Sequence, residues 1–365
     1  HDESAVPFLS ELSRIVDEYE RPSAGGSKRH LVIAESGLND RRVVESRTRG
    51  GRGMHAAWAD DFHHALHSYL TGEQDGYYAD FGSLERAVQA IEEGWCLSWE
   101  YSKAHRRHHG NDPAGLPTGS FVFCTQNHDQ VGNRMLGDRL STLAGPRADR
   151  ATRALLLLLP YVPLLFMGQE DGETRPFLYF VDHTDPDLLE ATRQGRMREF
   201  ADFAHQGTPP DPGSRETFER SVLAWPRPDE RPPRRETGDP AGASDRADDN
   251  RTDDNRTHND LAITRRLLEL RASHDCFRPS APGHPEVSRR AWIEDETLLV
   301  RLAGRNDAAL LVCNLSDTAR EIAAPAAASG RSGASSETLA ASKRGDDARI
   351  VFSSSHASVA GDRFP

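Results

Sequence analysis

Cysteine is scarce in this 365-residue chain, and so are long hydrophobic runs. The four cysteines lie far apart and form no Cys-x-x-Cys pair, which argues against a zinc cluster and against a disulfide framework. Cysteines used in this way are typical of a reducing compartment, so we expect a cytoplasmic protein. The longest apolar run, residues 154–168, contains two prolines and is too short to span a bilayer. We interpret it as buried core.

Lysine is almost absent, and arginine supplies nearly all of the positive charge. The 57 Asp and Glu residues outnumber the 45 Lys and Arg residues, which gives a formal net charge of −12. This acidic balance argues against nucleic acid or an anionic membrane as the main partner. Hydrophobic residues make up 36% of the chain, below the usual globular share, so we expect at least one stretch that is not folded.

Short apolar runs alternate with helical patterns in the first part of the chain. The predicted strands cover residues 30–36, 120–125 and 163–167, and the predicted helices cover residues 4–20, 83–93, 150–159 and a stretch after Pro186. Polar residues cluster just past the end of each strand. This alternation predicts a parallel α/β domain, in which functional sites lie at the carboxyl ends of the strands.

The composition changes after residue 225. Residues 226–259 are rich in Pro, Arg, Asp and Asn and contain a tandem Asp-Asp-Asn-Arg-Thr repeat, so we predict a disordered insertion. Helical spacing resumes at residues 260–280. From Val287 the hydrophobic period changes to two, which predicts a small antiparallel all-β domain over residues 287–365 with a turn at Gly304–Asp307.

Two carboxylates, Glu35 and Asp129, follow strand ends of the same predicted sheet. We expect such positions to be open to a ligand and partly shielded from water, which suits a general acid. Two carboxylates that face one bond are the chemistry of glycoside hydrolysis. For either residue alone, a structural role as a helix cap or as half of a salt bridge explains the position about as well as a catalytic role does.

A dense polar cluster surrounds Asp129. Asn127, His128 and Gln130 flank it, and Arg134 follows shortly afterwards. Amide, imidazole, carboxylate and guanidinium groups make polar contacts with hydroxyl-rich ligands, and a structural turn rarely needs so many of them. We therefore favour a binding role for this segment.

A third cluster combines aromatic, acidic and imidazole side chains. It consists of Trp58, Asp60, Asp61, Phe62, His63, His64 and His67. On a helix His63 and His67 would share one face, as zinc ligands do, but the HExxH pattern is absent. Sugar binding fits the residue types better than metal binding, and a polar loop over the mouth of a barrel remains an alternative. Asp185 and Pro186 predict an ordinary helix start.

These motifs resemble the alpha-amylase superfamily of glycoside hydrolases and, within it, the malto-oligosyltrehalose trehalohydrolase family. The resemblance covers residues 4–225 densely and resumes near Leu261. It is carried by the segments His30–Glu35, Asp60–His67, Thr71–Glu73, Gly76–Gly82, Gln126–Arg134, Phe166–Glu170, Pro176–His183, Gly195–Arg196 and Glu199–Phe200. Asn127-His128-Asp129 marks the superfamily, whereas Asp60–His67 and Pro176–His183 select the family.

The resemblance implies that residues 1–225 are the C-terminal half of a catalytic (β/α)8 barrel. It implies hydrolysis of the α-1,4 bond next to the terminal trehalose of maltooligosyl trehalose, by a retaining mechanism without metal or cofactor. Glu35 would be the general acid/base and Asp129 the transition-state stabiliser. The segments Asp60–His64 and Tyr179–His183 would be loops on the trehalose side. The implied substrate-binding residues are Asn127, His128, Gln130, Arg134, Asp60, Asp61, Phe62, His63, His64, Tyr179, Phe180, Asp182 and His183.

The sequence departs from the superfamily at one point. A retaining enzyme needs a nucleophilic Asp at the end of the fourth barrel strand, with an Arg two residues before it, and we find no such pair. Because this pair and the first four barrel strands are missing, we expect a C-terminal fragment that is inactive by itself. The alternatives are a glycogen branching or debranching enzyme and a non-catalytic glucan-binding protein.

Overall fold

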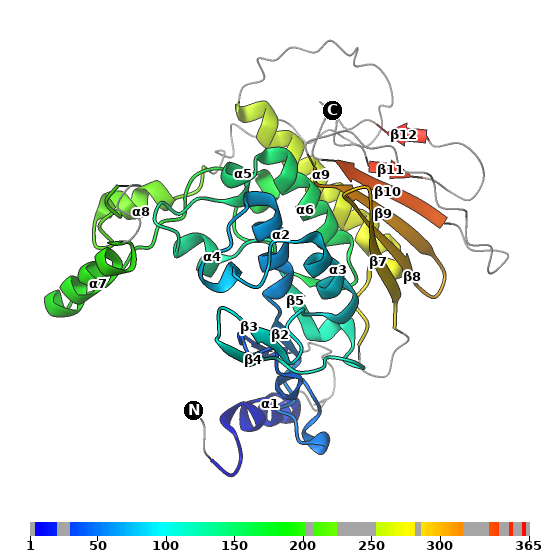
Figure 1. The fold of residues 1–365 in the computed structure, drawn as a ribbon, viewed down its shortest axis with the longest axis horizontal. Helices are drawn as coiled ribbons and strands as arrows, with labels where there is room; N and C mark the ends of the chain where they lie inside the picture. Colours follow the sequence, from blue (N-terminus) through cyan, green and yellow to red (C-terminus); the bar gives the residue numbers. More distant parts are fainter. Residues whose placement is uncertain are drawn as a thin grey trace.

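The computed structural model describes residues 4–19, 30–201, 207–224, 253–281, 286–316, 336–342, 350–352 and 360–362. Within these ranges a parallel sheet with helices is joined to a second, mostly antiparallel sheet (Figure 1). One hydrophobic core spans both, because Phe121 and Phe123 of the first sheet and Leu298 and Val300 of the second belong to the same buried cluster. The predicted fold class, a partial barrel followed by a small β-domain, is confirmed.

The parallel sheet has the strand order β1-β2-β5-β6. Its strands are β1 (Ile33–Ala34), β2 (Ala56–Trp58), β5 (Phe121–Phe123) and β6 (Val162–Pro163). Three of them lie in or at the predicted strand ranges, although each is shorter than predicted. Strand β2 was not predicted, because three residues are too few to show a period. It lies between β1 and β5, and this position decides the geometry of the candidate site.

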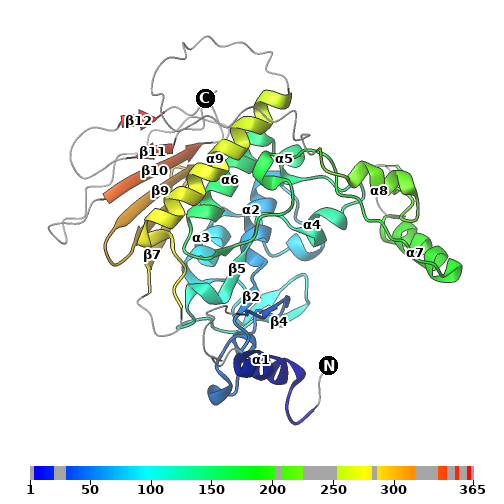
Figure 2. The ribbon, with the colours of Figure 1, turned by 180° about the vertical axis from the view of Figure 1, so that it is seen from behind.

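Helices cover this sheet and connect its strands. They are α1 (Phe8–Tyr19), α2 (Asp61–Thr71), α3 (Leu84–Glu93), α4 (His128–Gly132), α5 (Leu140–Leu143), α6 (Pro146–Leu158), α7 (Pro186–Glu199), α8 (Arg215–Ser221) and α9 (Asp253–Ser273). The apolar run that we interpreted as core begins in the last part of helix α6, where Leu156 and Leu157 are fully buried. Helix α9 lies alongside α6 (Figure 2). None of the helices described is long and apolar enough to cross a membrane.

The start of α9 corrects one predicted boundary. The disordered insertion was predicted to reach residue 259, yet the helix begins at Asp253, within the second copy of the repeat. The apolar spacing that predicted the helix starts only at Leu261, whereas intrahelical hydrogen bonds let a helix extend through polar residues before its buried stretch. The rest of the predicted insertion lies outside the described residues.

The second sheet has the order β10-β9-β8-β7. Its strands are β7 (Ser288–Glu294), β8 (Thr297–Ala303), β9 (Ala308–Asn314) and β10 (Ser336–Ser342). The first three pair antiparallel, as predicted, and the predicted turn joins β8 to β9. Strand β10 instead pairs parallel to β9, so the sheet is mixed at that edge. Strands β11 (Ile350–Phe352) and β12 (Ala360–Asp362) form a separate antiparallel pair.

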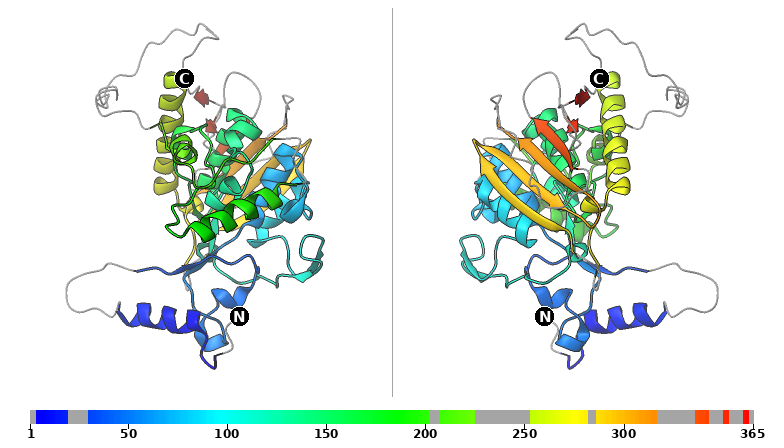
Figure 3. Two further views of the ribbon diagram at one scale, coloured as in Figure 1. Left: turned by 90° about the vertical axis from the view of Figure 1, so that its left-hand side faces the viewer. Right: turned by 90° about the vertical axis from the view of Figure 1, so that its right-hand side faces the viewer.

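The remaining described elements lie outside the two main sheets. Helices α7 and α8 project to one side of the parallel sheet, and α1 lies at one end, away from the mixed sheet (Figures 1 and 3). The predicted start of α7 is confirmed, because the Asp185 side chain accepts hydrogen bonds from the backbone N–H groups of Asp187 and Leu188. A two-stranded hairpin, β3 (Glu100–Ser102) and β4 (Arg107–His109), connects α3 to β5.

Candidate functional site

Three carboxyl groups meet at the carboxyl edge of the parallel sheet. Glu35 follows β1, Asp60 follows β2, and Asp129 lies in the first turn of α4 after β5. These strands are consecutive neighbours, so their ends lie side by side. Burial and then the charges of Asp61, Asp129 and Glu35 raise the pKa of Asp60 to about 6. In the strand order, Asp60 lies between the two predicted catalytic carboxyls, Glu35 and Asp129, and the charges of both act on it.

Glu35 itself is exposed, and so is Asp129. The predicted shielding of Glu35 from water is therefore wrong for the described part of the chain. The physical reason is that β1 is an edge strand of the described sheet, so only one neighbouring strand covers it. Asp60, which follows β2, is a carboxyl group whose pKa is raised by burial.

Asn127 serves as the N-cap of α4. Its side-chain oxygen accepts hydrogen bonds from the backbone N–H groups of Asp129 at 2.8 Å and Gln130 at 3.2 Å, and the residue is buried. The amide oxygen thus orients the helix start, and the predicted sugar contact of Asn127 stays a prediction. His128 is exposed and meets the ring of Trp58 edge-on at 5.9 Å between centroids. Its imidazole thus remains accessible next to Asp129.

Arg134 is tied to the end of α2. It donates two hydrogen bonds to Glu73, at 2.7 and 2.8 Å, and His67 lies 2.8 Å from the same carboxylate. The hydrogen bond with His67, followed by those from Arg134, lowers the pKa of Glu73 to about 2. Arg134 was predicted to bind substrate, and its pairing with Glu73 gives it instead the role of holding the segment after α4 against α2.

His63 joins three elements. Its Nδ1 lies 2.6 Å from the carbonyl oxygen of Thr125, which can only accept, so Nδ1 carries the proton and donates. Its Nε2 lies 3.0 Å from the hydroxyl of Tyr78, which then donates to it. Burial holds the pKa of His63 well below its usual range. Both nitrogens of this neutral imidazole have partners in the protein, so His63 has a structural role here, and its predicted sugar contact stays a prediction.

His64 and Phe62 are packing residues. Phe62 is fully buried and stacks on Phe123 at 4.6 Å between ring centroids, which excludes it from a surface ligand site. His64 contacts the rings of Tyr77 and Phe81, and burial lowers its pKa to about 3. The stretch predicted as a loop on the trehalose side is therefore the first turn of helix α2, and its ring side chains point into packed surroundings.

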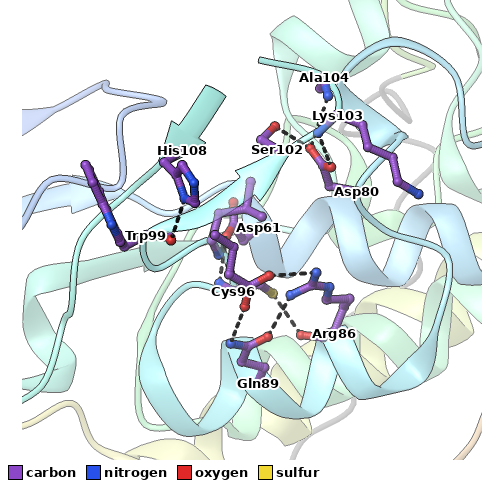
Figure 4. Close-up of polar contacts among 12 residues, drawn as sticks. Asp61, Asp80, Arg86, Gln89, Cys96, Trp99, Ser102, Lys103, Ala104 and His108 are labelled. Carbon is purple, nitrogen blue, oxygen red and sulfur yellow. Dashed lines mark hydrogen bonds and ion pairs between the residues drawn. The ribbon is translucent and has the colours of Figure 1, made fainter. Parts of the chain in front are cut away.

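Asp61 anchors the chain before the hairpin. Its Oδ2 accepts a hydrogen bond from the backbone N–H group of Cys96 at 2.7 Å (Figure 4). It also accepts from the backbone N–H group of Leu97 at 2.9 Å and from the side chain of Asn39 at 3.0 Å. The side chain is buried, and burial raises its pKa. Asp80 fixes the hairpin tip in the same way, through Ser102 and the next two backbone N–H groups. Asp61 thus has a structural role through its Oδ2, and its predicted substrate contact stays a prediction.

The remaining predicted residues precede α7. They are Tyr179, Phe180, Asp182 and His183, and all of them are exposed. The guanidinium of Arg196 lies over the ring of Tyr179 at 4.8 Å, and Arg196 also donates to the backbone oxygen of Arg134 at 3.5 Å. Tyr179 and Phe180 thus lie near the segment after α4. Both rings are exposed, so a ligand that extends away from Asp129 can reach them.

Sequence reasoning missed Glu73 and Tyr78 as members of the network. Gly72 ends α2 in the left-handed region, at φ 77°, and this turn returns Glu73 to the side of His67. Tyr78 stacks on His67 at 4.5 Å between centroids. A glycine directly after a helix was the available signal for the reversal. Among the described residues no group of three or more His, Cys, Asp or Glu is arranged to hold a metal ion.

Comparison with known proteins supports the predicted resemblance. No family model matches the chain. It is 42% identical over 224 residues to the malto-oligosyltrehalose trehalohydrolase of Saccharolobus solfataricus, 44% over 235 residues to that of Arthrobacter ramosus and 41% over 230 residues to that of Mycobacterium tuberculosis. These matches cover 61%, 63% and 61% of this chain and 37%, 40% and 39% of those proteins. The chain thus spans about two fifths of the length of these relatives.

A solved structure from Salmonella typhimurium, described as an alpha-amylase, is similar in fold and sequence. The TM-score is 0.63 and the identity 34%, over 83% of this chain and 49% of that chain. The resemblance to the alpha-amylase superfamily and to the trehalohydrolases within it is confirmed by these two kinds of similarity.

Proposed function

We propose that the protein to which these residues belong is a glycoside hydrolase that releases trehalose from maltooligosyl trehalose. The observation that carries the proposal is the meeting of Glu35 and Asp129 at one sheet edge, in a chain about 40% identical to relatives named for this activity. The acidic net charge is compatible with a neutral, hydroxyl-rich substrate.

The chemistry assigns a separate role to each carboxyl. Glu35, exposed at the end of β1, donates a proton to the glycosidic oxygen as the bond breaks and later takes a proton from water. Asp129 stabilises the positive charge that develops on the sugar ring. The exposed imidazole of His128 donates a hydrogen bond to the sugar beside it.

A retaining reaction also needs a nucleophilic carboxylate about 5–5.5 Å from the acid. We assign that role to none of the described residues, since Asp60 is largely buried and Asp61 is occupied by backbone donors. Accordingly, we propose that residues 1–365 alone bind oligosaccharide without turning it over.

The test uses the full-length product of the gene and the isolated 365-residue chain side by side. Free trehalose released from maltooligosyl trehalose is measured for both, and action on a branched glucan is measured in parallel. We expect trehalose from the full-length protein only, and a loss of about a thousandfold in Glu35→Gln, because the proton donor is gone.

Glu85→Gln is the matched control, since Glu85 is an exposed carboxyl on α3 outside the site. Undiminished trehalose release by Glu35→Gln would refute the assignment of the acid. Preferred action on branched glucan would favour a branching or debranching enzyme. Binding without turnover by the full-length protein would favour a glucan-binding protein.

A further inference from the structure

Asp60 occupies the N-cap position of α2 but does not cap it. Its side chain makes no hydrogen bond to the first backbone N–H groups of the helix, although aspartate at this position usually does. The side chain is instead held by a hydrogen bond from the side chain of Gln130, which comes from α4. The carboxyl group is therefore directed across the sheet edge, between the ends of β1 and β5.

Two oxygen atoms of this pair have no partner. Asp60 Oδ1 and Gln130 Oε1 are both buried and accept no hydrogen bond from the part of the chain that the structure describes. Gln130 is 6% exposed, so its amide is fixed by packing. Buried acceptors without donors are unfavourable, so these two atoms call for a donor that the described residues do not supply, such as a group on a ligand.

The surroundings of Asp60 are acidic on each side. Asp61 follows it on α2, Glu35 comes from the end of β1, and Asp129 comes from α4. The buried thiol of Cys124 faces it from the residue after β5. The charged groups that most influence this carboxyl among the described residues are all acidic, so a neutral donor such as a sugar hydroxyl suits the site better than a second anion.

We propose that Asp60, held by Gln130, binds a hydroxyl group of the oligosaccharide between Glu35 and Asp129, and does so only when its carboxyl is ionised. Oligosaccharide binding is then controlled by proton concentration at a group that takes no part in bond cleavage. This inference rests on the proposed function for the class of ligand, and it adds to that site a position for the Asp60 contact and a regulatory property.

The ionised form is favoured because a carboxylate accepts a stronger hydrogen bond from a hydroxyl than a carboxylic acid does. The pKa of Asp60, raised to about 6, puts the change within the neutral range. Affinity for oligosaccharide should therefore rise as the pH increases through 6. Glu35 and Asp129 face the same ligand, so the effect is isolated by comparing Asp60 variants with the unchanged protein.

The experiment measures maltohexaose binding to the 365-residue chain by calorimetry between pH 5 and pH 8. We expect the affinity of the unchanged protein to increase about three- to tenfold over this range. In Asp60→Asn we expect weaker binding and no rise in affinity around pH 6. Gln130→Met should weaken binding by a similar factor, because it removes the group that orients Asp60. The full-length protein should show the same step in KM, with kcat changed less.

Asp75→Asn is the control, since Asp75 also occupies an N-cap position without a side-chain cap but is exposed. An unchanged pH step in a folded Asp60→Asn variant, or affinity that falls as the pH rises, would overturn this inference and leave the proposed function intact. If neither the 365-residue chain nor the full-length protein binds maltohexaose at any pH, the proposed function fails and this inference fails with it.

Discussion

Arg134 and Glu73 form a two-point ion pair between the segment after α4 and the end of α2. Nη2 of Arg134 lies 2.7 Å from Oε1 of Glu73, and Nη1 lies 2.8 Å from Oε2. His67 joins the same carboxylate and stacks on Tyr78. The backbone that carries His128 and Asp129 is thereby fixed from both ends, by the Asn127 cap before it and by Arg134 after it.

Replacing Glu73 with Gln should remove an acid-dependent part of the stability. The pKa of Glu73 is lowered to about 2 in the folded protein, so its contribution is complete above pH 4.5 and is lost as the pH falls toward 2. Because the side chain is 34% exposed, we expect about 1–2 kcal/mol at pH 7. Urea unfolding at pH 7, 5 and 3 measures this. Equal losses in Glu73→Gln at pH 7 and pH 3 would contradict it.

Replacing His64 with Phe should make the protein less sensitive to mild acid. The pKa of His64 is lowered to about 3, so the unfolded chain binds a proton below pH 6.5 that the folded chain does not. Stability is therefore complete above pH 6.5 and declines as the pH falls toward 3. We expect Phe to keep the ring contacts and to reduce the loss between pH 6.5 and pH 4 by about 2 kcal/mol. His108→Phe, at an exposed ring, should leave the loss unchanged.

Truncation of Asp61 should destabilise the fold. Asp61→Ala leaves the backbone N–H groups of Cys96 and Leu97 without their acceptor, which we expect to cost about 3 kcal/mol. Asp61→Asn keeps one oxygen and should cost less. Thermal unfolding of both variants, with Asp75→Ala as the exposed control, measures this. A stable Asp61→Ala variant with reduced oligosaccharide affinity would instead support the substrate contact predicted from the sequence.

A buried ion cluster should secure α9 to α6. Asp260 accepts hydrogen bonds from Arg150 at 2.7 and 2.9 Å and from Arg153 at 2.5 Å, and Arg153 is fully buried. Asp260→Ala leaves that guanidinium without a carboxylate, which typically costs about 3–5 kcal/mol. The loss is measured by urea unfolding. Glu269→Ala breaks an exposed ion pair on the same helix and should cost under about 1 kcal/mol; similar losses in both would refute the prediction.

The sequence alone determined the classes of structure and the resemblance to a family. Apolar runs bounded by turn residues predicted strands of the parallel sheet, and the change to a period of two predicted the second sheet, because burial on two faces and on one face leaves different patterns. Asp185 and Pro186 predicted a helix start from local backbone chemistry alone. Glu35 and Asp129 were predicted as site residues because residues that follow a buried strand lie at the sheet edge.

The tertiary structure decided which polar residues are available to a ligand. Asp60 and Asp61 are adjacent and identical in type, but their side chains have different partners. Asp60 turns toward Gln130 and keeps one oxygen without a partner among the described residues, whereas Oδ2 of Asp61 accepts hydrogen bonds from two backbone N–H groups. His63 and His128 differ in the same way, one enclosed between Thr125 and Tyr78 and the other exposed. A side chain's partners come from segments far away along the chain, so its free hydrogen-bonding capacity is a property of packing that residue type and spacing do not encode.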